Sequence, residues 1–189
     1  PGTSQLVGAA VGRAIASCAL DDGVFSILYD GGHEVGARLV AHPGVKAVGF
    51  TGSQAGGSAL ARLAAGRAEP IPVFAEMGSV NPVVILPGAL AASADEIAAG
   101  LLGSCTLGVG QFCTNPGLAF VPAGDDGDRL VARLAELAAA TELPAMLTSG
   151  IAAAYDAGAK RLVEAGARIA GEASGGVTAA RVFEIAGED

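Results

Sequence analysis

The alternation of strand-like and helix-like segments along the sequence constrains the fold of this chain more than any other feature. Runs of β-forming residues, such as 47–51 and 71–75, alternate with segments whose apolar residues recur every three or four positions. The first pattern is typical of strands and the second of amphipathic helices. Since parallel strands need a long crossover between them, usually a helix, this order predicts an α/β fold with a parallel sheet.

The expected elements cover most of the chain. Ser93 and Glu96 form a capping-box pattern, which predicts that a helix begins there. The best candidate for a boundary between domains is the segment 78–82. We expect strands at 24–29, 47–51, 71–75, 82–86, 118–121, 168–170 and 182–185. We expect helices around 4–18, 35–39, 60–64, 97–105, 130–137 and 151–162.

Composition narrows the class of protein. A hydrophobic fraction of 51% excludes a disordered chain, and a net charge of −8 without a basic cluster argues against nucleic-acid binding. The apolar run 83–86 is far shorter than the roughly 20 residues that span a bilayer. Three widely spaced cysteines predict neither a disulfide framework nor a metal cluster. We expect a cytoplasmic globular protein, and the start without Met suggests a piece of a longer one.

Two residues are candidates for catalysis. Cys113 lies in the glycine-rich segment 108–117, where a thiol near backbone N–H groups can become reactive, although a structural thiol is equally consistent. Cys18 and Cys105 lie on apolar helical faces and are expected to be buried. Glu76 ends the strand at 71–75, where α/β proteins bind ligands, although a solvated strand end is the commoner role.

The turn at 50–53 is a candidate phosphate-binding site. Gly52 permits close approach, and Ser53 opens a helix whose first N–H groups are free to bind an anion. No G-x-G-x-x-G pattern follows an expected strand, so an ordinary capped turn remains the alternative. His33 and His42 lie near helix ends, where capping or surface roles are expected.

Three segments together resemble the aldehyde dehydrogenase superfamily. Residues 42–53 resemble its strand–turn–helix ending in a phosphate-binding Gly-Ser, residues 74–82 its glutamate motif, and residues 110–113 its cysteine motif. The sequences of the glutamate and cysteine segments are most similar to the branch that contains α-ketoglutaric semialdehyde dehydrogenases and an NADP-using fatty aldehyde dehydrogenase. The resemblance implies part of a Rossmann-like NAD(P)-binding domain at 1–77 and the earlier part of the catalytic domain at 78–189.

The resemblance also implies roles for individual residues. Cys113 would be the nucleophile that forms a thiohemiacetal with the aldehyde and then a thioester, its own N–H donating to the oxyanion. Glu76 would activate the water that releases the acid. Ser53 would hold the pyrophosphate of NADP or NAD. The glycines implied to line the cofactor are Gly32, Gly36, Gly52 and Gly78.

The resemblance leaves two alternatives open and several parts missing. A CoA-acylating relative would release the thioester to CoA without a base, and an inert dinucleotide-binding or structural remnant would use Cys113 as a core thiol. The family's second oxyanion donor, a cofactor-binding lysine, a ribose-binding glutamate and its oligomerisation strands have no counterpart in this chain. The chain by itself is therefore expected to be inactive, and its parent to be a homo-oligomer acting on a small aldehyde.

Overall fold

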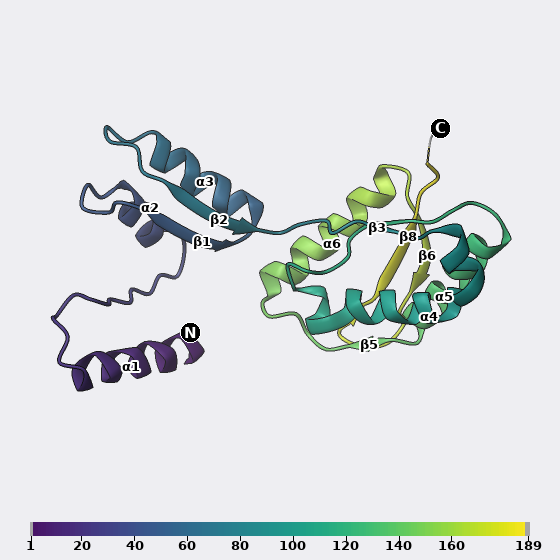
Figure 1. Ribbon diagram of the computed structural model, residues 1–189, viewed down its shortest axis with the longest axis horizontal. Coiled ribbons are helices and arrows are strands. Elements are labelled where there is room, and N and C mark those ends of the chain that lie inside the picture. Colours follow the sequence, from purple (N-terminus) through teal and green to yellow (C-terminus); the bar gives the residue numbers. More distant parts are fainter. Residues whose placement is uncertain (1, 188–189) are drawn as a thin grey trace. The chain divides into compact units, whose positions relative to one another are not determined.

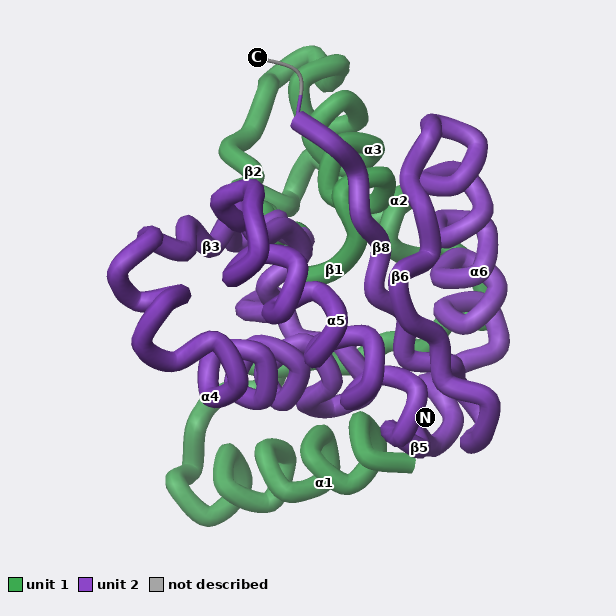
Figure 2. Tube along the Cα trace, turned by 90° about the vertical axis from the view of Figure 1, so that its right-hand side faces the viewer, with its two compact units in different colours: residues 1–77 green, residues 78–189 purple. Residues whose placement is uncertain are grey.

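The computed structural model describes residues 2–187 and divides the chain into two compact units (Figure 1; Figure 2). The first unit comprises residues 1–77 and the second residues 78–189. Each unit has its own strands and helices and is described by itself. Among the described residues, no helix is both long and apolar enough to span a membrane.

The first unit is built around two parallel strands joined by a helix. Its elements are α1 (Gly2–Ser17), α2 (Glu34–Ala41), β1 (Val48–Gly52), α3 (Gln54–Ala65) and β2 (Val73–Met77). Strands β1 and β2 pair in parallel, with Thr51 opposite Glu76, and α3 connects them. Helix α2 packs against α3. The strand–helix–strand crossover expected from the sequence is therefore confirmed.

Polar side chains fix both ends of α3. Ser53 is its N-cap, with extended backbone (φ −69°, ψ 152°), and its Oγ accepts a hydrogen bond from the Gly56 N–H at 3.2 Å. Arg67 follows the other end and donates from Nη1 to the carbonyl oxygens of Val40 at 2.9 Å and Val45 at 3.0 Å. This guanidinium ties the end of α2 and the turn before β1 to the end of α3.

The strand expected at 24–29 is wrong. These residues are not hydrogen-bonded as a strand, and Val24 and Leu28 are exposed. Among the residues that the structure describes, β1 and β2 pair only with each other in this unit, so the segment has no neighbour. A strand is stabilised by the partner that completes its ladder, and β propensity without a partner is insufficient.

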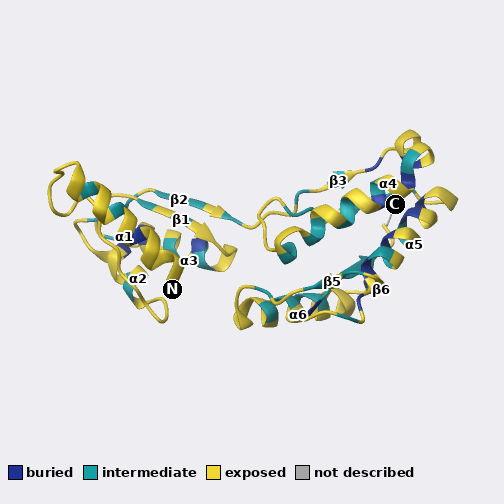
Figure 3. Ribbon diagram, turned by 90° about the horizontal axis from the view of Figure 1, so that it is seen from below, coloured by how far each residue is buried: buried dark blue, intermediate teal, exposed yellow. Residues whose placement is uncertain are grey.

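The second unit has its core between two helices. Its first elements are β3 (Val83–Val84), α4 (Pro87–Thr106), the 3-10 helix η1 (Leu107–Gly110), β4 (Ala119–Phe120) and α5 (Asp125–Ala139). Strands β3 and β4 are parallel. The core consists of Ile85, Leu90, Ala94, Ala98, Leu130 and Leu134. Figure 3 shows buried positions on α4 and α5, where the alanines allow close helix approach.

Helix α4 starts earlier than the capping box predicts. It begins at Pro87, whose fixed φ suits the first turn of a helix, and Ser93 interrupts it with non-helical backbone (φ −147°, ψ 37°). Among the described residues, the Ser93 hydroxyl accepts no hydrogen bond from the Glu96 N–H. The box therefore marks a kink between two helical segments rather than the start of the helix.

The last part of the second unit contains antiparallel pairs. Its elements are β5 (Glu142–Leu143), α6 (Ser149–Glu164), β6 (Arg168–Glu172), β7 (Thr178–Ala179) and β8 (Arg181–Glu184). Strand β5 pairs with β7, and β6 pairs with β8. The helix and the strands expected at 151–162, 168–170 and 182–185 are confirmed. Strands β5 and β7 were not predicted, because each has two residues and no run of β-forming residues continues around it as it does around β3 and β4.

Candidate functional site

Glu76 and the candidate phosphate-binding turn at 50–53 lie at the same edge of the first unit's sheet. Glu76 is exposed one residue before the end of β2, and its parallel partner Thr51 lies two residues before Ser53. The carboxyl ends of parallel strands are where α/β proteins place ligands. A Cβ at Gly52 would lie 2.7 Å from the Phe50 ring, so this turn accepts no larger residue without a shift.

The start of α3 is suited to an anion. Its first turn contains no acidic residue, and Ser53 is exposed. Gly56 donates to Ser53 Oγ, whereas within the described residues the N–H groups of Gln54 and Ala55 have no acceptor. Free N–H groups and the helix dipole favour a phosphate there.

An aspartate organises the turn before α2. The Asp30 carboxylate accepts hydrogen bonds from the N–H groups of Val35 at 2.7 Å and Gly32 at 2.9 Å. These donors, Val35 first, hold the pKa of Asp30 below its usual value. The sequence Asp30-Gly31-Gly32 is typical of a turn, and aspartate commonly closes such turns with its side chain. Gly32 and Gly36 are exposed beside it, and their contact with a cofactor stays a prediction.

The cysteine lies in an exposed loop whose backbone is held by side chains. Left-handed backbone at Gly108, Val109 and Gly110 (φ 59°, 60° and 70°) turns the chain out of α4. Asn115 Nδ2 donates to the carbonyl oxygens of Gly110 at 2.8 Å and Cys105 at 3.1 Å. Left-handed backbone is costly for β-branched valine and persists only where the surroundings enforce it. The loop that presents the thiol is thus a defined structure.

Gln111 holds the other side of this loop. Its Nε2 donates to the Gly108 carbonyl at 3.0 Å, and its Oε1 accepts from the Leu147 N–H at 2.9 Å. The glutamine of the cysteine motif therefore joins the loop to the chain before α6. The side chains of Asn115 and Gln111 replace the regular hydrogen bonds that a loop lacks.

The glutamate motif contributes to the cysteine loop through its last residues. Ser79 Oγ donates to the Cys113 carbonyl oxygen at 2.7 Å, and Asn81 Nδ2 donates to the same oxygen at 2.7 Å. Asn81 Nδ2 also donates to the Asn115 carbonyl at 3.0 Å. Hydrogen bonds therefore join the end of the glutamate motif to Cys113, the candidate nucleophile of the cysteine motif. These two residues were not singled out from the sequence.

The three thiols differ in their surroundings. Cys113 is exposed, whereas Cys105 is half-buried with its Sγ donating to the Pro116 carbonyl at 3.2 Å. Burial raises the pKa of the Cys105 thiol, which keeps it protonated and unreactive. The expectation that Cys18 is buried is wrong: α1 ends at Ser17, and Cys18 is exposed. Helix α1 buries only Gly8, so its apolar face does not cover the thiol.

Gly78 and His42 were also singled out from the sequence. Gly78 is exposed as the first residue of the second unit, and a Cβ there would meet nothing within 4 Å. Its contact with a nicotinamide stays a prediction. His42 has a turn-stabilising role near the end of α2, because its Nδ1 accepts from the Gly44 N–H at 3.1 Å.

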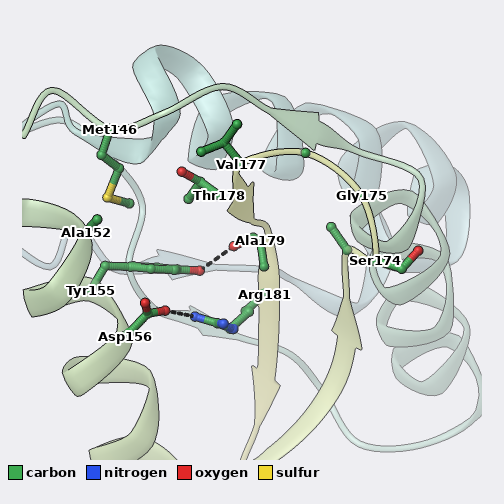
Figure 4. Close-up of a pocket in the computed structure, with 12 residues that line it drawn as sticks. Met146, Ala152, Tyr155, Asp156, Ser174, Gly175, Val177, Thr178, Ala179 and Arg181 are labelled. Atoms are coloured by element: carbon green, nitrogen blue, oxygen red, sulfur yellow. Dashed lines mark hydrogen bonds and ion pairs between the residues drawn. The ribbon is translucent and has the colours of Figure 1, made fainter. Parts of the chain in front are cut away.

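A separate hollow of about 290 Å³ lies between α6 and the strands that follow it (Figure 4). Arg181 crosses it, with Nη1 2.8 Å from Asp156 Oδ1 and Nε 2.6 Å from Glu172 Oε1. The guanidinium lies 5.1 Å from the Tyr155 ring centre, and the Tyr155 hydroxyl donates to Ala179. Burial raises the pKa of Tyr155, and Arg181 opposes the shift. The charge of Arg181 is already paired, which favours a structural role.

The comparisons with known proteins identify the family. The model of the aldehyde dehydrogenase family matches residues 2–170. The chain belongs to the aldehyde dehydrogenase family. It is 53% identical over 163 residues to alpha-ketoglutaric semialdehyde dehydrogenase 2 of Azospirillum brasilense, covering 86% of this chain and 31% of that protein. It is 40% identical to the alpha-ketoglutaric semialdehyde dehydrogenase of Acinetobacter baylyi, covering 85% of this chain and 30% of that one.

Solved structures agree with this aldehyde dehydrogenase assignment. Proline utilization A from Bradyrhizobium japonicum is 25% identical with a TM-score of 0.74, over 94% of this chain and 19% of that chain. A putative aldehyde dehydrogenase from Burkholderia cenocepacia is 23% identical and shares the fold, with a TM-score of 0.71 over 92% of this chain and 39% of that chain. The family expected from the three motifs is confirmed, and the chain spans less than a third of the curated relatives named above.

Proposed function

We propose that this chain forms part of an NAD(P)-dependent aldehyde dehydrogenase that oxidises 2-oxoglutarate semialdehyde to the carboxylic acid. The observation that carries the proposal is the exposed Cys113 in a hydrogen-bonded loop, within a family whose named relatives include two α-ketoglutaric semialdehyde dehydrogenases. Residues 1–77 would bind the cofactor, and residues 78–189 would carry the nucleophile.

The anchored loop of Cys113 suits nucleophilic catalysis. The thiolate attacks the aldehyde carbon to form a thiohemiacetal, whose negatively charged oxygen needs a donor. Within residues 2–187 the Cys113 N–H has no acceptor, so it is free to donate to that oxygen. Loss of hydride from the thiohemiacetal, for which NAD(P) would be the acceptor, leaves a thioester on Cys113.

Glu76 supplies the base that the second half of the reaction needs. Its exposed carboxylate can take a proton from water, which then attacks the thioester and releases the acid. Along the chain it stands three residues before Ser79, which contacts the cysteine loop. A base in the motif favours hydrolysis over transfer to CoA.

The residues around Ser53 fit the phosphate of NAD(P). Exposed free N–H groups, a hydroxyl and the lack of acidic side chains in the first turn of α3 suit a pyrophosphate. NAD(P), when bound, supplies the hydride acceptor. Ser53 and the start of α3 would hold its charged centre, and Gly52, Gly32, Gly36 and Gly78 would border it.

The test exchanges this chain for the matching segment of the Azospirillum enzyme. The full-length chimera is assayed for NADPH or NADH formation with 2-oxoglutarate semialdehyde, with and without CoA. We expect CoA-independent turnover, which Cys113→Ala abolishes and the matched Cys105→Ala retains. Turnover that survives Cys113→Ala, or that requires CoA, would contradict the proposal, as would a folded chimera that binds cofactor and oxidises no aldehyde.

A further inference from the structure

The carbonyl oxygen of Cys113 is held more firmly than its exposed position requires. Ser79 Oγ and Asn81 Nδ2 both donate to it at 2.7 Å, which occupies both of its lone pairs. Ser79 Oγ also lies 3.1 Å from Asn81 Oδ1, but its single hydrogen favours the shorter contact. An exposed carbonyl would otherwise be hydrated by water, so these bonds constrain direction more than they satisfy a buried group.

The two donors sit on backbone that runs beside the cysteine loop. The Gly117 N–H donates to the Val80 carbonyl at 2.7 Å, and a Cβ on Gly117 would lie 3.2 Å from that oxygen. Asn81 itself has left-handed backbone (φ 46°), which asparagine tolerates better than most residues. Segment 79–81 therefore contacts the loop through both backbone and side chains.

Holding this carbonyl orients the backbone around the nucleophile. The peptide that follows Cys113 is planar and trans, so a fixed oxygen also fixes the Thr114 N–H, which points the opposite way. Within residues 2–187 the N–H groups of Cys113 and Thr114 have no acceptors of their own. The carbonyl oxygen of Cys113 is therefore anchored, whereas the N–H groups of Cys113 and Thr114 are free to bind a ligand.

We propose that Ser79 and Asn81 are positioning residues for Cys113, which hold its carbonyl oxygen so that the thiol and its N–H meet the substrate in a fixed geometry. This inference rests on the proposed function and extends it to residues outside the reacting atoms. The hydrogen bonds lie apart from the core cluster of α4 and α5, so the reactivity of the thiol can be changed without opening that core.

Acylation by p-nitrophenyl acetate tests the proposal without any cofactor. The Cys113 thiolate attacks the ester carbonyl and expels p-nitrophenolate, leaving an acetyl thioester that peptide mass spectrometry assigns to a residue. The variants of the 189-residue chain are Ser79→Ala, Ser79→Thr and Asn81→Gly. Glycine at 81 keeps the left-handed backbone accessible while it removes the side-chain donor. Cys18 serves as the internal reference for reagent and pH.

We expect acetylation of Cys113 to slow by about tenfold in Asn81→Gly, and by several-fold in Ser79→Ala, relative to Cys18. Ser79→Thr keeps the hydroxyl and should restore the rate. Cys105 should stay unacetylated in these variants. Its thiol is hydrogen-bonded to the Pro116 carbonyl, so acetylation of Cys105 would report that the loop has opened.

Each other outcome overturns a distinct claim. Unchanged Cys113 rates in Asn81→Gly and Ser79→Ala would overturn the positioning role. So would a loss that Ser79→Thr does not restore and that exposes Cys105 equally, because it would show a purely structural role. A wild-type chain in which Cys113 reacts no faster than Cys18 would instead overturn the proposed function, and this inference with it.

Discussion

Gly171 is the position where one methyl group should most clearly damage the second unit. It lies in β6, and a Cβ there would overlap the Ala135 backbone of α5, 2.7 Å from its carbonyl oxygen and 2.9 Å from its carbonyl carbon. Ordinary carbon contacts need roughly 3.5 Å or more. Since backbone cannot rotate aside as a side chain can, α5 and β6 must separate by most of an ångström.

The cost follows from overpacking. Insertions of this kind cost about 1–3 kcal/mol, which corresponds to a 5–150-fold change in an opening equilibrium. We expect amide hydrogens of α5 to exchange faster by that factor in Gly171→Ala, measured by hydrogen–deuterium exchange mass spectrometry. Helix α5 carries the buried Leu130 and Leu134, so its opening reports the whole core cluster.

A matched substitution in the same unit provides the control. A Cβ on Gly100 of α4 would meet nothing within 4 Å, so Gly100→Ala adds only helix propensity. It should slow exchange in α4 by an amount equivalent to about 0.5–1 kcal/mol. Exchange in Gly171→Ala that is as slow as in wild type would refute the close contact between β6 and α5.

Three further predictions concern single polar groups. Arg67→Ala should destabilise the first unit by about 1–3 kcal/mol, because two carbonyls lose a charged donor, and urea unfolding should show Arg67→Lys to be intermediate. Because the pKa of Asp30 is lower in the folded state, its stabilising effect is present above the unfolded pKa, near 3.8, and is lost as pH falls through the lower folded pKa. Asp30→Asn should therefore make the free energy of unfolding depend less on pH in the acid range. An unchanged pH dependence would contradict the hydrogen bonds that Asp30 accepts from Val35 and Gly32. Because burial raises the pKa of Cys105, its alkylation by iodoacetamide should need higher pH than that of Cys18, and equal pH profiles would show that the thiol is not desolvated.

The order of helices and strands could be predicted, because it depends on the spacing of apolar residues within each segment. Strands β1 and β2 and helix α3 follow from their own residues, and so does the Ser53 cap. Segment 24–29 could not be judged in this way, because a strand depends on its neighbour. Burial of Cys18 failed for a related reason, since the apolar face of α1 has little to pack against in this chain.

The candidate site shows the same division. Cys113, Glu76 and Ser53 could be nominated from the sequence motifs, because each has a residue type that its proposed chemistry needs, and their roles stay predictions. The contacts of Ser79 and Asn81 with Cys113 could not be predicted, since they cross 34 and 32 residues and end on a backbone carbonyl. A carbonyl is present at every residue, so nothing in the sequence marks which one is held.

The most direct test of the account is to trap the acyl group in the chimera carrying Glu76→Gln. With the base removed, 2-oxoglutarate semialdehyde and NADP should give a burst of one NADPH per active site, followed by turnover about 10²–10⁴-fold slower than in the chimera with Glu76. Peptide mass spectrometry should then find the acyl thioester on Cys113. An acyl group on Cys105 or Cys18, or steady turnover at the original rate, would contradict the central claim.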